Sequence, residues 1–447
     1  MKRLSANEKW RQLRLRERRE KRRLRQRASQ SSRLAERSQL WGRGFDDAPE
    51  EEEERDPAVL TYSWPDVPDR GWYIREETAT IKCPKTFSLI ENPDETIEAF
   101  DRMVVARRDP RVREIIIDQR GVVDTDLCAS AVLGVLVQGG KGQVDRYQHL
   151  LPTDPAAREL ARAAGLPRIL RVPFADSRGV LFYDLVAGPP NAQRAKGSSL
   201  KEIEATNIVD YIDRCFGKYD FKLLPETRRH LSILITEVLS NSEDHTDLGA
   251  WWMAAYLRQG AAFGDCHLTL FNLGRTISES LRAPNVSERV RGGCEPVRQA
   301  LLSRKAFKRG YTEECFWNLA ALQPGVTSKP EGATVDEDRG TGFVRIIEAF
   351  QEIGVSPRAP SAPVMAVISG SSYIRLDGTY RLQDYRNEDG NSVQRIAFNA
   401  DNDLKEPPDR RFVHTIRKHF PGTILSCRFY IDRQHLLEQS RHVTALT

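Results

Sequence analysis

The chain has 447 residues, of which 40% are hydrophobic and 29% are charged, and its formal net charge is +5. This length and composition fit a globular protein of two or three domains and exclude a small disulfide-stapled scaffold. The seven cysteines are scattered without CxxC or Cys/His spacing, so we expect a reducing, cytoplasmic compartment and no structural zinc. The longest apolar stretch, ASAVLGVLV at 129–137, is about half as long as a bilayer span, so membrane insertion is not expected.

Residues 1–70 carry their charge in two blocks of opposite sign. The first 27 residues hold thirteen Lys and Arg against three Glu, and the acidic run DDAPEEEEERD follows at 46–56. Because this region lacks apolar periodicity, we expect a largely disordered tail whose basic part is helix-prone. Three interpretations of the basic arm remain open: a solvated tail, docking on an acidic partner, and non-specific binding of nucleic acid through residues 1–27.

From residue 75 short strands and helices alternate. TATIKCP and VREIIIDQRGVV are typical of strands, and PDETIEAFDRMVVARR lies between them as an amphipathic helix. DLCASAVLGVLVQGG predicts a second helix, and DPAARELARAAGLPRIL predicts a third, with Asp154 as its N-cap. This alternation predicts an α/β domain with a mixed sheet over 75–186, and a linker rich in Pro, Gly and small polar residues over 187–199.

The domain at 75–186 resembles a STAS domain, the anti-sigma-antagonist fold. The resemblance rests on the strand that ends in Asp118, on Asp126, on the small-residue helix ASAVLGVL and on the late ELARAAGL. In the family, the residue after the second Asp is the serine that switching members phosphorylate. Here that residue is Leu127, which has no hydroxyl group. The resemblance therefore implies a fold and an interaction surface, without the phosphorylation switch.

A polar ridge marks the second helix of the region 200–434, PETRRHLSILITEVLSNSEDH. Glu237, Asn241 and His245 follow one another at steps of four residues beside an apolar stripe that faces the core. A partly desolvated carboxylate can act as a general base, and a neutral amide oxygen can ligate Mg²⁺. The alternative interpretation is a solvated helix edge.

Three glycine-containing turns follow this helix, each beside an apolar strand or helix. Glycine lets the backbone approach a ligand closely, and the N-terminus of a helix favours phosphate. The residues of the three turns are Asn272 and Gly274, then Gly340, Thr341 and Gly342, and last Gly422 and Thr423.

In this order the ridge and the turns resemble the GHKL ATP-binding domain, whose superfamily includes gyrase, chaperones and histidine kinases. The ridge and the STAS-like neighbour are most similar to the anti-sigma-factor serine-kinase branch. The resemblance implies an α/β sandwich, a mixed sheet covered by helices, over 200–434, with a long lid at about 276–337 and a C-terminal tail at 435–447. It also implies ATP and Mg²⁺ as cofactors.

The resemblance implies a role for each matched residue. Glu237 would be the catalytic base, Asn241 the Mg²⁺ ligand and His245 a neighbour of the phosphates. Gly340, Thr341 and Gly342 would wrap the phosphates, and Gly422 and Thr423 would border the adenine pocket. Asn272 stands where the family has the Asp that reads adenine, so an amide oxygen replaces a charge-assisted acceptor.

We therefore expect an ATP-binding regulatory protein that hydrolyses ATP, or uses Mg-ATP as a conformational switch, to control a partner. The alternatives are a docking module with a decayed nucleotide site, a serine/threonine kinase of the anti-sigma type, and nucleic-acid binding through the basic arm. A protein partner would dock on the STAS-like face or the lid, and a homodimer remains open. The lid carries a basic cluster that either closes over phosphates, contacts a partner or is merely solvated: Arg298, Arg304, Lys305, Lys308 and Arg309.

Overall fold

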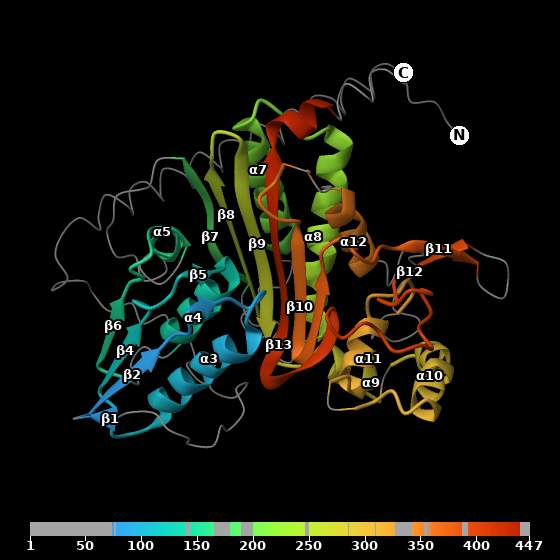
Figure 1. Ribbon diagram of the computed structural model, residues 1–447, viewed down its shortest axis with the longest axis horizontal. Helices are drawn as coiled ribbons and strands as arrows, with labels where there is room; N and C mark the ends of the chain where they lie inside the picture. The colour runs from blue at the N-terminus through green and yellow to red at the C-terminus, as the bar shows by residue number, and fades with distance from the viewer. Residues whose placement is uncertain are drawn as a thin grey trace, which may run out of the picture. The chain divides into compact units, whose positions relative to one another are not determined.

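The computed structural model describes residues 74–75, 77–139, 144–164, 179–188, 200–245, 250–284, 286–308, 310–326, 342–352, 356, 358–386 and 392–438. All of them belong to one compact unit that runs from Pro57 to Thr447. The unit is mixed α/β, with parallel and antiparallel sheets and covering helices (Figure 1). The predictions for residues 1–70, for most of the linker and for 439–447 lie outside the described residues. Among the described helices, none is both long enough and apolar enough to span a bilayer.

The first module contains a four-stranded sheet in the order β1-β2-β4-β6. Strands β2, β4 and β6 run parallel, and β1 pairs with β2 antiparallel. The strands are β1 (Ile74–Arg75), β2 (Thr78–Lys82), β3 (Thr86–Phe87), β4 (Glu114–Asp118), β5 (Asp124–Thr125) and β6 (Arg146–Leu150), with β3 and β5 forming a separate pair. Strand β6 was not predicted, because its sequence RYQHL contains only one aliphatic side chain.

The three predicted helices of this module are confirmed. They are α3 (Pro93–Arg108), α4 (Leu127–Gln138) and α5 (Pro155–Ala164). The carboxylate of Asp126 caps α4 by accepting a hydrogen bond from the Ala129 N–H at 2.7 Å. The predicted cap Asp154 accepts from the Ala157 N–H at 2.9 Å, which satisfies a backbone donor that the first turn of α5 leaves free.

The second module is built on a five-stranded sheet in the order β10-β13-β9-β8-β7. All four pairings are antiparallel, whereas the resemblance predicted a mixed sheet. The strands are β7 (Val180–Gly188), β8 (Trp251–Gln259), β9 (Phe263–Leu273), β10 (Val364–Leu376) and β13 (Val413–Asp432), and a side hairpin contains β11 (Gln383–Arg386) and β12 (Ser392–Arg395). The helices are α7 (Leu200–Gly217), α8 (Pro225–His245), α9 (Ile277–Arg282), α10 (Glu288–Ser303), α11 (Glu313–Ala320) and α12 (Gly342–Glu352).

Strand β7 changes the predicted domain boundary. Residues 180–186, expected at the end of the first domain, pair with β8 as the edge strand of the second sheet. Glycine is required at residue 188 of this strand, because a Cβ atom there would lie 2.2 Å from the indole of Trp251. The predicted end of the first domain at residue 186 therefore falls within a strand of the second sheet.

The two faces of the second sheet bury alternate side chains of β8, as the period of a strand requires. Trp251, Met253, Ala255 and Leu257 pack with residues of α7 and α8. Ala254 and Tyr256 point to the opposite face and pack with residues of α4 and α5. Figure 1 shows the same arrangement, with α3, α4 and α5 on one side of this sheet and α7 and α8 on the other.

The two modules consequently share one hydrophobic core instead of meeting through a linker alone. Leu127, which is only 1% exposed, packs with Leu160, Ala254 and Tyr256. On the same helix, burial raises the pKa of the Cys128 thiol, and the hydroxyls of Thr269 and Ser426 in the second sheet oppose this shift. Leu127, the residue that the STAS resemblance matches to the phosphorylated serine, is therefore buried inside this chain.

Candidate functional site

A row of side chains crosses four strands at one end of the second sheet. Ser369 of β10 pairs with Thr423 of β13, Thr423 with Asn272 of β9, and Asn272 with Trp251 of β8. Directly paired residues of antiparallel strands point to the same face. Trp251 packs with α7 and α8, so the whole row faces these helices.

Asn272 and Thr423, predicted from two separate motifs, are in direct contact. The Asn272 Oδ1 atom accepts a hydrogen bond from the Thr423 N–H at 3.0 Å. The Thr423 hydroxyl lies 2.9 Å from the Ser369 hydroxyl, and Ser369 also donates to the Gly422 carbonyl at 3.1 Å. Asn272 and Ser369 are both buried, while Thr423 is half-buried. The amide oxygen of Asn272 keeps a second lone pair for another donor.

The predicted glycines beside this row are required by the backbone itself. Gly422 has φ +148°, and a Cβ there would lie 2.2 Å from the Asn272 carbonyl oxygen. Gly274 has φ +123° and donates its N–H to the Pro421 carbonyl at 3.0 Å. The pairing of β10 with β13 also shifts register on both sides of Gly370. Such bulges often lie next to binding sites, because they redirect neighbouring side chains.

Helix α8 carries the predicted polar ridge over the same face of the sheet. Glu237 and Asn241 are half-buried, and the side chain of His245, the last residue of α8, lies outside the described residues. Two residues after Asn241, Glu243 accepts a hydrogen bond from the Trp251 indole N–H at 3.2 Å. This bond ties the C-terminal half of α8 to the end of the sheet that carries Asn272.

The predicted phosphate turn is described only in part. Gly340 and Thr341 lie outside the described residues, and Gly342 is the first residue of α12. Helix α12 packs against α8, as Figure 1 shows. The N-terminus predicted to receive phosphate therefore belongs to a helix that contacts the helix of Glu237 and Asn241.

Thr276 has a role that the sequence analysis missed. Its hydroxyl accepts from the Glu279 N–H at 3.2 Å, and the Glu279 carboxylate accepts from the Thr276 N–H at 2.8 Å. This reciprocal capping box starts α9 immediately after the Asn272 turn, and the Thr-x-x-Glu spacing signals it in the sequence. The next residue, Ile277, donates its N–H to the Ser369 hydroxyl at 2.9 Å, so the cap and the polar row are joined.

The insertion predicted as a lid contains three packed helices among its described residues. Helices α9, α10 and α11 contribute Leu281, Leu301 and Leu319 to a core shared with β10 and β13. Two cations of the predicted cluster are neutralised: Arg298 pairs with Glu295 and Glu313, and Arg304 pairs with Glu406. Lys305 and Lys308 are exposed, and Arg309 lies outside the described residues. These three ion pairs do not favour a cluster that closes as a whole over phosphates.

A perturbed carboxylate lies on α11 at the Gly370 bulge. Glu314 accepts a hydrogen bond from the Ser371 N–H at 3.1 Å, and a Cβ on Gly370 would lie 1.8 Å from its Oε1 atom. Burial raises the pKa of Glu314, although the bond from Ser371 and the charge of His419 oppose the shift. The bulge therefore accommodates an acidic group, and glycine is needed to make room for it.

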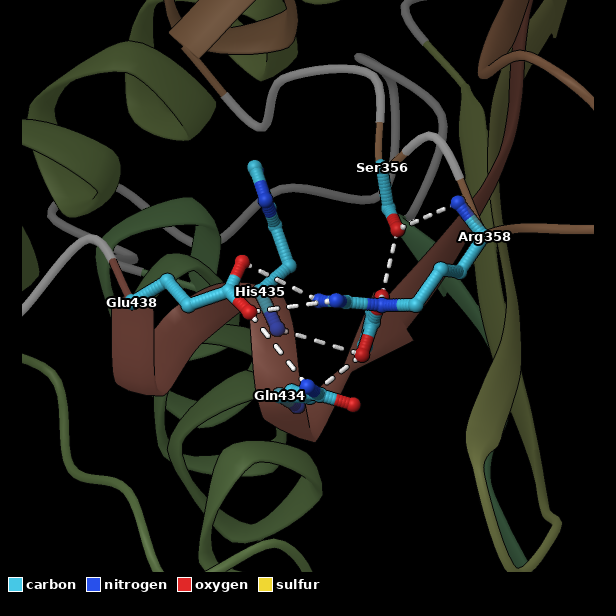
Figure 2. Close-up of polar contacts among 6 residues, drawn as sticks. Ser356, Arg358, Gln434, His435 and Glu438 are labelled. Atoms are coloured by element: carbon cyan, nitrogen blue, oxygen red, sulfur yellow. Dashed lines mark hydrogen bonds and ion pairs between the residues drawn. The ribbon is translucent and has the colours of Figure 1, made fainter.

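The opposite end of the sheet holds a hydrogen-bonded network that fixes the C-terminal segment (Figure 2). Asp432 accepts from the Ser356 hydroxyl, from Arg358 Nε at 3.2 Å and from the backbone N–H of Gln434 at 2.9 Å. Arg358 also reaches both carboxylate oxygens of Glu438, at 3.1 and 3.3 Å. Burial alone would raise the pKa of Asp432, but hydrogen bonds, the one from Ser356 first, lower it. The network joins the chain before β10 to the end of β13.

No group of three or more His, Cys, Asp and Glu side chains is placed to hold a metal ion within the described residues. The predicted Mg²⁺ site does not depend on such a group, because Mg²⁺ in nucleotide sites takes one or two protein ligands together with phosphates and water. Comparisons with protein-family models, curated proteins and solved structures found no match to this chain.

Proposed function

We propose that this chain is a nucleotide-binding regulatory protein that takes Mg-ATP between α8, α12 and the polar row of the second sheet. The observation that carries the proposal is the contact between Asn272 and Thr423, two residues from motifs about 150 positions apart in the sequence. Their side chains face the helix that bears Glu237 and Asn241. Two of the motifs that resemble a GHKL domain, the Asn272 turn and the Gly422–Thr423 turn, thus support the proposal by meeting at one end of one sheet.

The donor and acceptor chemistry of these residues fits an adenine nucleotide. The free lone pair of the Asn272 amide oxygen can accept from an exocyclic amino group, and the half-buried Thr423 hydroxyl lies next to it. The Asn241 amide oxygen is a suitable Mg²⁺ ligand, and Glu237, one helical turn earlier, is placed to orient a water molecule. When bound, Mg²⁺ would neutralise the charge of the phosphates.

Use of the nucleotide as a switch is favoured over self-directed kinase action. The residue at the family's phosphoacceptor position is Leu127, and it is buried against the second sheet. The same burial covers part of the STAS-like face that was expected to receive a partner. A regulatory partner would instead meet surfaces near α9 to α12, where the Asn272 turn continues directly into the capped helix α9.

Thermal unfolding of the full chain with saturating Mg-ATP tests the proposal. A ligand that binds the folded state alone stabilises it by about 2.7 kcal/mol at a concentration of 100 times Kd, so the Tm should rise by several degrees. Asn241→Ala should weaken the Mg²⁺ dependence of this rise. The matched control is Asn207→Ala, which changes an exposed asparagine of α7.

Hydrolysis is tested separately by phosphate release. Glu237→Gln should abolish release while Mg-ATP still raises the Tm, and Glu226→Gln, an exposed position of the same helix, should release phosphate at the parent rate. If saturating Mg-ATP leaves the Tm unchanged, the nucleotide site is decayed and the chain acts by docking alone. If Glu237→Gln releases phosphate normally, Glu237 is not the base.

A further inference from the structure

A groove of about 580 Å³ lies between α9, α10 and α11. This volume is within the range of pockets that hold small ligands or the anchoring side chains of a peptide. Helix α10 forms one wall with a stripe at helical spacing: Glu288, Arg291, Gly292 and Glu295. The remaining lining residues are Leu281 and Arg282 of α9 and Trp317 of α11.

Two adjacent glycines, Gly292 and Gly293, lie within α10, where glycine weakens a helix relative to almost any other residue. Gly292 is four residues before Pro296 of the same helix, and the ring of a proline lies against the backbone at that position. A Cβ atom at either position would meet nothing within 4 Å, so neither glycine makes room for a neighbouring element. Of the two, Gly292 lines the groove. A missing side chain at this position keeps the groove open to another molecule.

The charges of the groove are unequal. Glu295 is neutralised by Arg298, which donates to both of its carboxylate oxygens at 2.8 and 2.7 Å. Arg291 donates to the backbone carbonyls of Ala283 and Pro284 at 2.7 and 2.6 Å, and these neutral acceptors leave its charge uncompensated.

The two arginines of the lining differ in their surroundings. The charge of Arg282 acts on the half-buried carboxylate of Glu314 on α11. The hydrogen bonds of Arg291 to Ala283 and Pro284 go to neutral carbonyl groups. The guanidinium group of Arg291 is therefore the one that favours an acidic ligand.

Apolar surface lies beside the two guanidinium groups. Leu281 and the large indole of Trp317 line the groove, and Trp317 is nine-tenths buried. Its indole N–H has no hydrogen-bond acceptor among the described residues. Tryptophan and arginine are the residues that most often dominate binding energy in protein interfaces. A polyphosphate backbone would not use this apolar surface, so the groove suits a peptide better than a nucleic acid.

We propose that this groove docks an acidic peptide segment of a partner protein. A carboxylate of the segment pairs with Arg291, and an adjacent aromatic or aliphatic side chain packs on Leu281 and Trp317 across Gly292. Arginine can hold a carboxylate with two parallel hydrogen bonds, which fixes the orientation of the segment. The proposal does not depend on nucleotide binding. It extends the proposed function by placing a partner on the helices that follow the Asn272 turn.

Selection of short random peptides displayed against the intact chain tests this proposal. We expect enrichment of sequences in which Asp or Glu is next to an aromatic or aliphatic residue. Synthetic copies of the enriched peptides should bind about tenfold or more weakly to Arg291→Gln, because a charge-assisted contact is lost. Arg289→Gln, which removes an exposed arginine of α10 outside the groove lining, should bind within about twofold of the parent.

The glycine pair supplies a second, matched comparison. Gly292→Leu should reduce peptide binding at least about tenfold, because the leucine fills the groove, whereas Gly293→Leu should bind within about twofold of the parent. Leucine has the higher helix propensity and meets open space at both positions, so both variants should fold with undiminished thermal stability.

Several outcomes would overturn the proposal: no enrichment, enriched peptides without acidic residues, or full binding by Gly292→Leu. Displacement of the peptides by short single-stranded nucleic acid would assign the groove to a phosphate backbone instead. Conversion of a dimer to a monomer by Gly292→Leu, measured by light scattering, would assign it to a second copy of the chain.

Discussion

The burial of Leu127 predicts that the two modules unfold as one. This side chain is 1% exposed and joins α4 and α5 of the first module to β8 of the second. Leu127→Ala removes three side-chain carbons, which is about 2.4 kcal/mol of transfer free energy at about 0.8 kcal/mol per carbon. The cavity left behind brings the expected loss of unfolding free energy to about 2–5 kcal/mol. Leu127→Ser should cost about 1 kcal/mol more, because it buries a hydroxyl group.

Urea unfolding of the full chain measures this loss. Circular dichroism reports both modules, while tryptophan fluorescence reports seven residues, among them Trp251 and Trp252 of the second sheet and Trp317 of α11. Both signals should shift together in Leu127→Ala. The control is Val123→Ala, a nearby side chain that is 60% exposed, which should change the free energy by less than about 0.5 kcal/mol. A loss below about 1 kcal/mol in Leu127→Ala, or two separated transitions, would refute a shared core.

Three further predictions concern polar groups. Asn272→Asp keeps the oxygen that accepts from the Thr423 N–H and adds a charge-assisted hydrogen bond to adenine. Calorimetry should therefore show about tenfold tighter ATP binding, and an unchanged Kd would remove this residue from base recognition. Burial alone would raise the pKa of Asp265, but the imidazole of His267, whose Nε2 lies 3.2 Å away, and the guanidinium of Arg428 lower it. Its stabilisation is therefore complete above its unfolded pKa of about 3.9 and is lost as the pH falls below that value. Asp265→Asn should therefore cost about 1–3 kcal/mol at neutral pH and flatten the decline in stability below about pH 4, and a decline as steep as in the parent would contradict this assignment. Ser356→Ala removes the buried hydrogen bond from Ser356 to the carboxylate of Asp432, part of the network in Figure 2. It should lower the free energy of unfolding by about 1 kcal/mol, and an unaltered Tm would count against the network.

Local rules were sufficient for the helices and their caps. Helix α3 coincides with PDETIEAFDRMVVARR, and the predicted Asp154 caps α5, because both depend on side chains a few residues apart. Similarly, the turns that contain Gly274 and Gly422 could be predicted, because glycine is required where backbones approach closely. The sequence could have shown one more feature, the capping box of Thr276 and Glu279, because its Thr-x-x-Glu spacing is local.

Pairing between distant segments could not be predicted in the same way. Strand β7 follows the first module in the chain but pairs with the second sheet. This pairing could not be predicted, because the sequence of an edge strand does not show which neighbouring strand will satisfy its backbone hydrogen bonds. The strand order of the second sheet also depends on pairing between distant segments. The contact between the hydroxyls of Ser369 and Thr423 in the polar row depends on the same kind of pairing.

Most helices of the first module, their caps and the glycine turns could be predicted from the sequence. These features follow from periodicity, side-chain capping and backbone sterics, all of which act over short distances. The contact of Asn272 with Thr423, the burial of Leu127 against α5 and β8, and the position of Gly292 in an open groove were visible only in the folded structure. Each of these results depends on which distant segments pack against each other and exclude water from the surface between them. The packing of the whole chain sets that arrangement.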